Sequence, residues 1–129
     1  MLHAPFNPAT PGSQLVQWSW TGGANQQWRL VPLGGDLYAI ASVGTGMVLD
    51  VAGGSRVDGA PVVQTRWNGN VAQWWRLIPL SADGRVYVLA SVQSGKVVDV
   101  AQGSSADGAP VVQWGWNGGA NQIWVKVGL

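Results

Sequence analysis

The sequence lacks several residue types on which common functional sites depend. It contains no cysteine, which excludes a disulfide framework and thiolate chemistry. All six acidic residues are aspartates, and the one histidine is His3. No nucleophile triad, metal-ligand cluster or glycine-rich phosphate loop can be recognised. The sequence therefore predicts no catalytic residue, no metal site and no cofactor, and the protein is not expected to be an enzyme.

Charge and long apolar runs are also scarce. Charged residues make up 10% of the chain and the formal net charge is +1, without a run of Lys or Arg that would attract nucleic acid or an anionic membrane. No stretch approaches the roughly 18 apolar residues of a transmembrane helix. The first residues lack the basic and apolar regions of a signal peptide. We therefore expect neither nucleic-acid binding nor membrane insertion, and the residues alone leave the localisation unknown.

What the chain does contain is a repeat. Residues 12–30 recur at 59–77 and at 108–126, and residues 42–60 recur at 91–109. Each copy of the first block carries a tryptophan followed by a Gln-x-Trp motif. The aligned positions are Trp20, Trp67 and Trp116, then Gln26, Gln73 and Gln122, then Trp28, Trp75 and Trp124. The length of 129 residues suits a single domain, 1–129, with repeats at about 1–43, 44–92 and 93–129.

The repeats have the composition of strands and turns. Short runs of Val, Leu, Ile and Tyr alternate with Gly, Asn and Asp, and in the second repeat they predict strands at 47–51, 62–67, 75–79 and 86–92. Asp58 and Asp107 each precede a glycine, which a turn explains. Such short repeats must share one core. A solenoid or an incomplete propeller remains an alternative, but closure into a barrel removes exposed edges, so we favour an all-β trefoil with pseudo-threefold symmetry.

Gln-x-Trp at one place in three β-rich repeats, two of them with an Asp-Val strand upstream, resembles the ricin B-type lectin family. These β-trefoils also serve as carbohydrate-binding modules of glycoside hydrolases. The matching motifs run from 49–55 to 73–75 and from 98–101 to 122–124, so the resemblance covers nearly the whole chain. It implies a non-catalytic domain that binds glycans or polysaccharides through neutral, galactose-type sugars, and it favours an extracellular location.

The resemblance also implies roles for most of the tryptophans. The Gln-x-Trp residues of this family build the trefoil core, with the Gln amide tying turns together. We also assign to the core the three tryptophans that stand where disulfide-containing relatives often have cysteine, which are Trp20, Trp67 and Trp116. Trp18, Trp74 and Trp114 do not recur in every repeat, so they are the candidates for contact with a ligand.

The family pattern places an Asp after the first strand, an aromatic residue at the end of the second, and an Asn before Gln-x-Trp. The third repeat holds the full set and is the principal predicted site. Asp99 would accept from hydroxyls, Trp114 would stack on the apolar face of a sugar, and Asn121 would bridge a hydroxyl. Gln122 would support the aspartate. Trp116 remains an alternative for the stacking role.

The other two repeats hold incomplete sets, which we treat as possible partial sites. The second repeat keeps Asp50 and Gln73. It has Thr65 at the stacking position and Ala72 at the asparagine position, so we expect weak binding. The first repeat places His3 where the others have aspartate, and an imidazole does not replace a carboxylate acceptor at neutral pH. Its residues that fit the pattern are Trp18, Asn25 and Gln26.

The ends of the sequence leave one strand unaccounted for. Four strands in each repeat would make twelve, and only eleven can be assigned. An open edge invites pairing with another chain, so three explanations stay open: a module of a larger protein, a self-association interface, or an N-terminal segment that fills the gap. We hypothesise that Met1–Ala4 partly fills it. The alternative function is a trefoil scaffold for protein contact or oligomerisation, such as a protease inhibitor or a toxin-docking module.

Overall fold

The computed structural model describes residues 2–3 and 11–125, and it consists of short strands with five one-turn 3-10 helices. The first repeat contains β1 (Leu2–His3), β2 (Ser13–Gln14), β3 (Val16–Gln17), η1 (Ala24–Gln26), β4 (Trp28–Gly34) and β5 (Leu37–Ser42). The second contains β6 (Val48–Val51), η2 (Ala52–Gly54), β7 (Val62–Thr65), η3 (Val71–Gln73), β8 (Trp75–Pro79) and β9 (Val86–Ser91). The third contains β10 (Val97–Val100), η4 (Ala101–Gly103), β11 (Val111–Trp114), η5 (Ala120–Gln122) and β12 (Trp124–Val125). None of the helices in this part of the chain has the length and apolar character to span a bilayer.

Equivalent strands pair in the same register in each repeat. In the β6–β7 hairpin Asp50 lies opposite Val63, and in the β10–β11 hairpin Asp99 lies opposite Val112. In β1–β3 the residue at that place is His3, opposite Val16. The repeat alignment that put His3 in the position of the two aspartates is therefore confirmed.

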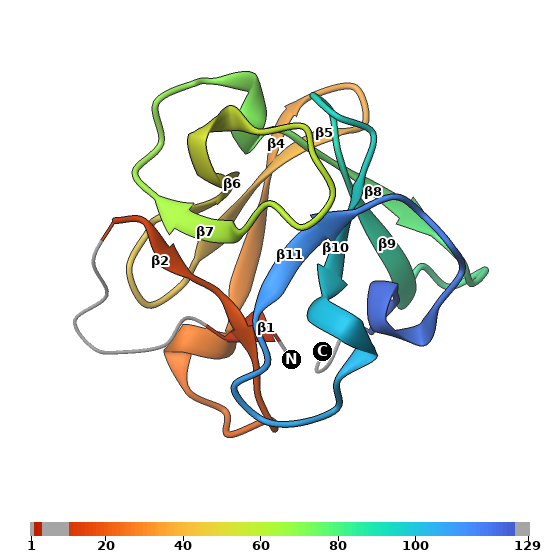
Figure 1. Cartoon of the computed structure of the whole chain (residues 1–129). Helices are drawn as coiled ribbons and strands as arrows, with labels where there is room; N and C mark the ends of the chain where they lie inside the picture. The colour runs from red at the N-terminus through yellow and green to blue at the C-terminus, as the bar shows by residue number, and fades with distance from the viewer. Residues whose placement is uncertain (1, 4–10, 126–129) are drawn as a thin grey trace.

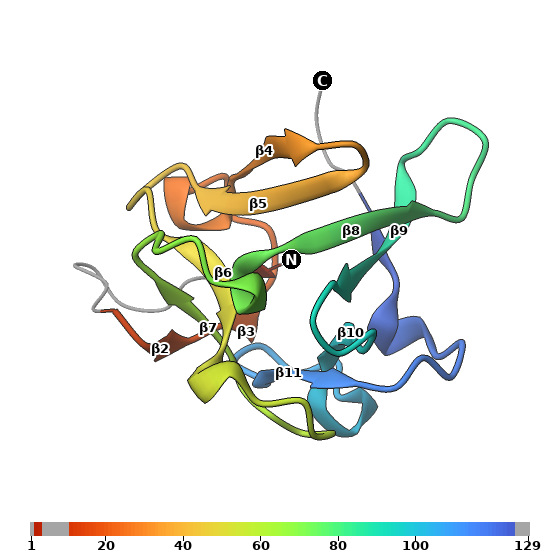
Figure 2. The ribbon, with the colours of Figure 1, turned by 90° about the horizontal axis from the view of Figure 1, so that it is seen from above.

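The three repeats contact one another in a ring (Figure 1). The N–H of Gly12 in the first repeat donates to the carbonyl of Gln64 in the second at 2.8 Å. Gly59 donates in the same way to Gln113 of the third repeat, and Gly108 donates to Gln17 of the first, each at 2.8 Å. The longer strands pair side by side in the order β4, β5, β8, β9 (Figure 2). The all-β trefoil with pseudo-threefold symmetry is confirmed.

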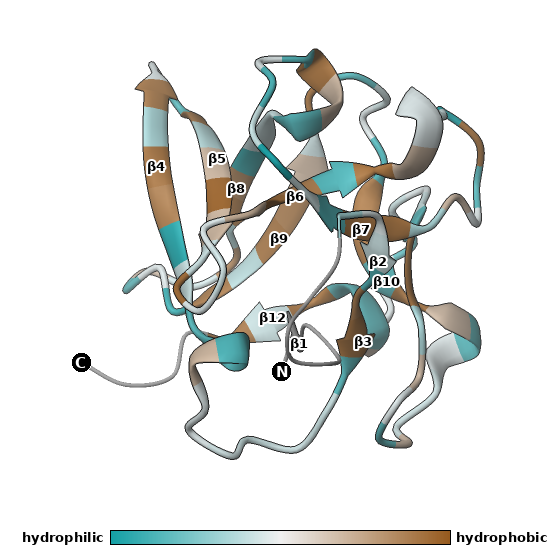
Figure 3. Ribbon diagram, turned by 90° about the vertical axis from the view of Figure 1, so that its left-hand side faces the viewer, coloured by the Kyte–Doolittle hydropathy of each residue, from teal (hydrophilic) through white to brown (hydrophobic). Residues whose placement is uncertain are grey.

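One core lies on the axis and takes equivalent residues from each repeat. Leu15, which lies between β2 and β3, and the equivalent residues Val62 of β7 and Val111 of β11 are fully buried. Trp75 is also fully buried, while Trp28 and Trp124 are half-buried and pack against the same cluster. Brown, hydrophobic positions accordingly recur along the strands, and the loops are mostly teal or white (Figure 3). The core role of the Gln-x-Trp tryptophans is confirmed.

The core assignment of the other repeated tryptophans is wrong. Trp20, Trp67 and Trp116 are 48%, 46% and 49% exposed. The reason is where the strands end. β7 stops at Thr65 and β11 stops at Trp114, so Trp67 and Trp116 lie in the following loops, outside the alternation that turns every second strand residue toward the core.

The strand that the sequence leaves unaccounted for would lie between β4 and β12. β8 pairs with β5 on one side and β9 on the other, whereas β4 pairs with β5 and β12 pairs with β9. No strand in the described residues joins β4 to β12. Leu2–His3 pairs with β3 instead, so the hypothesis that Met1–Ala4 fills the gap is wrong for these two residues. Met1 and Ala4 lie outside the described residues.

Candidate functional site

The third repeat brings its four predicted site residues to one hairpin and one short helix. In β10–β11, Val97 lies opposite Trp114 and Asp99 lies opposite Val112, so Asp99 and Trp114 belong to the same face of the hairpin. Asn121 and Gln122 come from η5. The Nδ2 of Asn121 donates to Asp99 Oδ1 at 3.0 Å, and the Nε2 of Gln122 donates to Asp99 Oδ2 at 2.9 Å.

The Asp99 carboxylate is buried and held by neutral amides. The residue is only 4% exposed, and burial raises the pKa of its carboxyl above the usual value of 3.8. The hydrogen bonds from Gln122 and Asn121 act in the opposite direction, and the negative charge of Asp58 adds a smaller upward contribution. A buried acceptor bonded to uncharged donors is suited to a ligand that offers hydroxyl or amide hydrogens.

Two glycines that are not among the predicted site residues make room for the side chains of Asn121 and Asn25. A Cβ atom added at Gly119 would lie 2.5 Å from Asn121 Oδ1, and one added at Gly23 would lie 2.7 Å from Asn25 Oδ1. Gly119 has an ordinary φ of −68°, so space rather than backbone conformation requires the glycine. The signal in the sequence is Gly-x-Asn in the first and third repeats, which becomes Asn70-x-Ala in the second.

Trp114 and Trp18 pack against a turn of the preceding repeat while remaining partly exposed. They are 43% and 39% exposed. The Cζ3 atom of Trp114 lies 3.7 Å from where a Cβ of Gly59 would be, and the Cζ3 of Trp18 lies 3.6 Å from the same point at Gly108. Each indole therefore rests on a glycine turn and keeps part of its surface available for contact.

The aspartates before those glycines do more than form turns. Asp58 Oδ1 accepts a hydrogen bond from the N–H of Gly115 at 3.0 Å. Asp107 Oδ1 accepts from the N–H of Ser19 at 2.8 Å and from its hydroxyl at 2.9 Å. The turn that the sequence predicts is therefore not their whole structural role, because each carboxylate also fixes the loop after the candidate stacking tryptophan of the next repeat.

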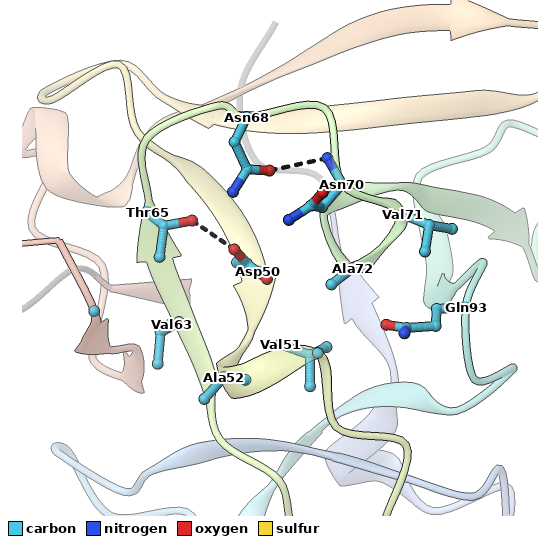
Figure 4. Close-up of a pocket in the computed structure, with 13 residues that line it drawn as sticks. Asp50, Val51, Ala52, Val63, Thr65, Asn68, Asn70, Val71, Ala72 and Gln93 are labelled. Atoms are coloured by element: carbon cyan, nitrogen blue, oxygen red, sulfur yellow. Dashed lines mark hydrogen bonds between the residues drawn. The ribbon is translucent and has the colours of Figure 1, made fainter.

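The second repeat forms a cavity of about 620 Å³ beside Asp50 (Figure 4). The Thr65 hydroxyl donates to Asp50 Oδ2 at 2.7 Å, and Gln73 Nε2 donates to the same oxygen at 3.2 Å. Asn68, Asn70 and Gln93 also line it. In the described part of the chain no donor reaches Asp50 Oδ1. This cavity has polar groups but no aromatic side chain in its lining.

The first repeat has the tryptophan and amides without the carboxylate. Gln26 is buried, its Oε1 accepts from the N–H of Thr21 at 2.7 Å, and its Nε2 donates to the Ser19 carbonyl at 2.8 Å. Asn25 precedes it in η1, and Trp18 follows β3. The equivalent of Asp99 is His3 in β1. Across residues 2–3 and 11–125, no cluster of three His, Cys, Asp or Glu side chains is placed to bind a metal.

Two solved structures resemble the chain at substantial sequence identity. The crystal structure of the designed 3-fold symmetric protein ThreeFoil is 40% identical with a TM-score of 0.91, and the match covers 98% of this chain and 90% of that one. An exo-beta-1,3-galactanase from Clostridium thermocellum is 38% identical with a TM-score of 0.83. That match covers 89% of this chain but only 25% of the galactanase.

More distant relatives share the fold. The Macrolepiota procera ricin B-like lectin, solved in complex with lactose, is 20% identical with a TM-score of 0.74, over 87% of this chain and 77% of that one. No curated protein sequence matches the chain significantly. The family model described as "Ricin-type beta-trefoil lectin domain-like" matches residues 1–65, 34–114 and 71–128. Because these matches span almost the whole chain, the protein belongs to the ricin-type β-trefoil lectin-like family.

Proposed function

We propose that the protein is a non-catalytic carbohydrate-binding domain that recognises neutral, galactose-type sugars, mainly through its third repeat. The observation that carries this proposal is the Asp99 carboxylate, held by the amides of Asn121 and Gln122, on the hairpin face that also carries the partly exposed Trp114. Membership of a lectin-like family and the lactose complex of the Macrolepiota procera lectin support it.

The chemistry of this site suits a sugar. A carboxylate has about four acceptor positions, and Asn121 and Gln122 fill one on each oxygen of Asp99. A hydroxyl can therefore donate to the carboxylate without breaking either bond. The indole of Trp114 offers a flat apolar surface for the C–H face of the ring. The low charge of the protein also suits a neutral ligand, since no ion pairing is required.

The partial sites would contribute less. In the first repeat Trp18, Asn25 and Gln26 offer stacking and amide contacts without a carboxylate. In the second repeat Asp50 and Gln73 offer a carboxylate without stacking, and Thr65 already donates to Asp50. Several weak sites on one molecule bind a multivalent glycan more tightly than a free sugar, because the later contacts are intramolecular.

A glycan array followed by calorimetric titration of galactose, lactose and xylan fragments tests the proposal. We expect binding of galactose-containing glycans that falls by about tenfold or more in Asp99→Asn and in Trp114→Ala, because each change removes a direct ligand contact. Asp83→Asn is the matched control, since Asp83 is an exposed turn residue whose carboxylate accepts hydrogen bonds from the Ser81 hydroxyl and the Arg85 N–H. Failure to bind any glycan, or binding that survives both site substitutions, contradicts the proposed function.

Among the described residues no strand lies between β4 and β12, which supports the second candidate function, an oligomerisation scaffold. Leu30 and Val31 of β4 and Val125 of β12 are exposed apolar residues, and a β4 edge can pair with its own copy across a twofold axis. Sedimentation equilibrium of the wild type and of Val31→Lys tests this. A dimer that Val31→Lys dissociates would support the scaffold, and a monomer at all concentrations would count against it.

A further inference from the structure

An exposed tryptophan lies in the loop after β3, after β7 and after β11, at positions 20, 67 and 116. Burying a large apolar side chain stabilises a protein by about 1.5–3 kcal/mol, and each of these indoles forgoes part of that gain. Single apolar residues scattered over a surface need no explanation. A tryptophan that recurs at one place in three diverged repeats is not scattered, which points to a contact made outside the folded chain.

The backbone on both sides of each of these tryptophans is fixed by the buried Gln of the Gln-x-Trp motif. Gln122 accepts from the N–H of Asn117 at 2.9 Å and donates to the carbonyl of Gly115 at 2.9 Å, so Trp116 lies between two anchored residues. Gln26 holds Thr21 and Ser19 around Trp20 in the same way, and the corresponding bonds of Gln73 hold Asn68 and Arg66 around Trp67. Ordering of these loops is therefore completed on folding and does not oppose ligand binding.

The first and third repeats add a second anchor and a second tryptophan. Asp58 fixes the residue between Trp114 and Trp116, and Asp107 fixes the residue between Trp18 and Trp20. The second repeat has neither feature. Its residue before the loop is Thr65, and the position equivalent to Asp58 and Asp107 is Pro11, which has no carboxylate. The aspartate anchor thus holds Gly115 and Ser19, and each of these residues has a tryptophan on both sides.

We propose that each tryptophan pair, Trp18 with Trp20 and Trp114 with Trp116, forms a platform for two consecutive units of a glycan chain. The inference rests on the proposed function and specifies its ligand as an oligosaccharide or polysaccharide rather than a single terminal sugar. Two residues of extended backbone span at most about 7 Å, which is the scale of neighbouring rings in a glycan. Asp58 is partly neutralised by Lys96 at 3.4 Å, so the third-repeat platform suits an uncharged chain.

Calorimetry with a ladder of ligands tests this inference. The probes are galactose and β-1,3-linked galacto-oligosaccharides of two, three and four residues, titrated into the whole protein. The measured quantity is the ratio of disaccharide to monosaccharide affinity. We expect this ratio to be about tenfold in the wild type, equivalent to about 1.4 kcal/mol, and to fall toward one in Trp20→Ala/Trp116→Ala. Trp67→Ala is the matched control, since Trp67 has no companion ring, and it keeps the wild-type ratio.

A second set of variants keeps every ring and changes only the anchors. Asp58→Ala and Asp107→Ala release Gly115 and Ser19, so the ratio should fall by about threefold as the rings lose their fixed spacing. Circular dichroism checks that each variant remains folded. A wild-type ratio near one, a ratio unchanged in the double tryptophan variant, or an equal loss in Trp67→Ala overturns the platform while galactose binding remains. Absence of binding to galactose and to the whole ladder overturns the proposed function itself.

Discussion

The fit between Gly119 and Asn121 gives the sharpest prediction. In Gly119→Ala the new Cβ would lie 2.5 Å from Asn121 Oδ1, closer than nonbonded carbon and oxygen atoms can approach. The Asn121 side chain must therefore rotate. Its Nδ2 then loses the bonds to Asp99 Oδ1 and to the Val100 carbonyl, both 3.0 Å long.

The size of the effect follows from those two bonds. A bond to a charged group contributes about 1.5–3 kcal/mol and a neutral one about 0.5–1.5 kcal/mol, and water replaces part of both because Asn121 is half-buried. Alanine itself stabilises a position of ordinary φ by about 0.4–1 kcal/mol through the unfolded chain. We expect Gly119→Ala to lower the free energy of unfolding by about 1–2 kcal/mol.

A double-mutant cycle with Asn121→Ala isolates the cause. The new Cβ would also lie 2.9 Å from Asn117 Oδ1, but the second repeat shows that this contact is tolerated. There Asn68 Oδ1 accepts from the N–H of Asn70 at 2.9 Å, although Asn70 has a Cβ. In the Asn121→Ala background Gly119→Ala should therefore be neutral or slightly stabilising.

Urea denaturation at neutral pH and galactose titration provide the measurements for the cycle. The expected coupling is about 1–3 kcal/mol in stability, above the roughly 0.5 kcal/mol within which independent sites add. Gly119→Ala should also weaken sugar binding about as much as Asn121→Ala does. Equal costs of Gly119→Ala in the two backgrounds would refute the argument that this glycine exists to seat the asparagine.

Three further predictions concern the core, the buried carboxylate and the cavity. Trp75→Ala should destabilise the fold by about 3–5 kcal/mol because it empties a fully buried site, whereas Trp116→Ala should change the free energy of unfolding by less than about 1 kcal/mol, as urea denaturation can show. Burial raises the pKa of Asp99 in the folded state, so its contribution to stability is greatest below about pH 3.8 and is lost as the pH rises through the raised value. Relative to Asp99→Asn, the wild type should thus lose stability from pH 3 to 7, while its sugar affinity, which needs the carboxylate, should rise over the same range; a flat difference would contradict the assignment. Thr65→Trp should add a stacking surface beside Asp50 and create measurable galactose binding in the second repeat of a Trp114→Ala variant, detected by calorimetry.

The fold could be predicted because its determinants are local and repeated. Strand β8 runs from Trp75 to Pro79 as expected, and the aligned aspartates occupy the same register place in β6 and β10. Because the same pattern of strand and turn residues occurs three times, few arrangements bury the apolar residues of all three copies. β7 is shorter than expected because Gln73 binds the backbone of Arg66 and Asn68, which bends the chain after Thr65.

Burial of individual tryptophans could not be predicted in the same way. Recurrence shows that positions 20, 67 and 116 occupy the same place in the repeat, but an exposed position recurs as faithfully as a buried one. These three tryptophans differ from Trp75 because the preceding strand ends before each of them and hydrogen bonds hold the loop that contains them. The anchoring carboxylates come from residues 57 and 88 positions away along the chain, and the sequence near each tryptophan does not reveal them.

The hydrogen bonds of the two aspartate carboxylates show how the candidate sites of the second and third repeats differ. Asp99 is bonded by Asn121 and Gln122, and Asp50 is bonded by Thr65 and Gln73. Where the third repeat has the ring of Trp114, the second repeat has Thr65, whose hydroxyl donates to Asp50 Oδ2 and offers no stacking surface. Both carboxylates keep acceptor positions open, because Asp99 receives one amide bond on each oxygen and Asp50 receives both of its bonds on Oδ2. Under the proposed function, a sugar in the third repeat would add hydrogen bonds to an ordered carboxylate, and its selectivity would come from where Trp114 and Trp116 allow the hydroxyls to lie.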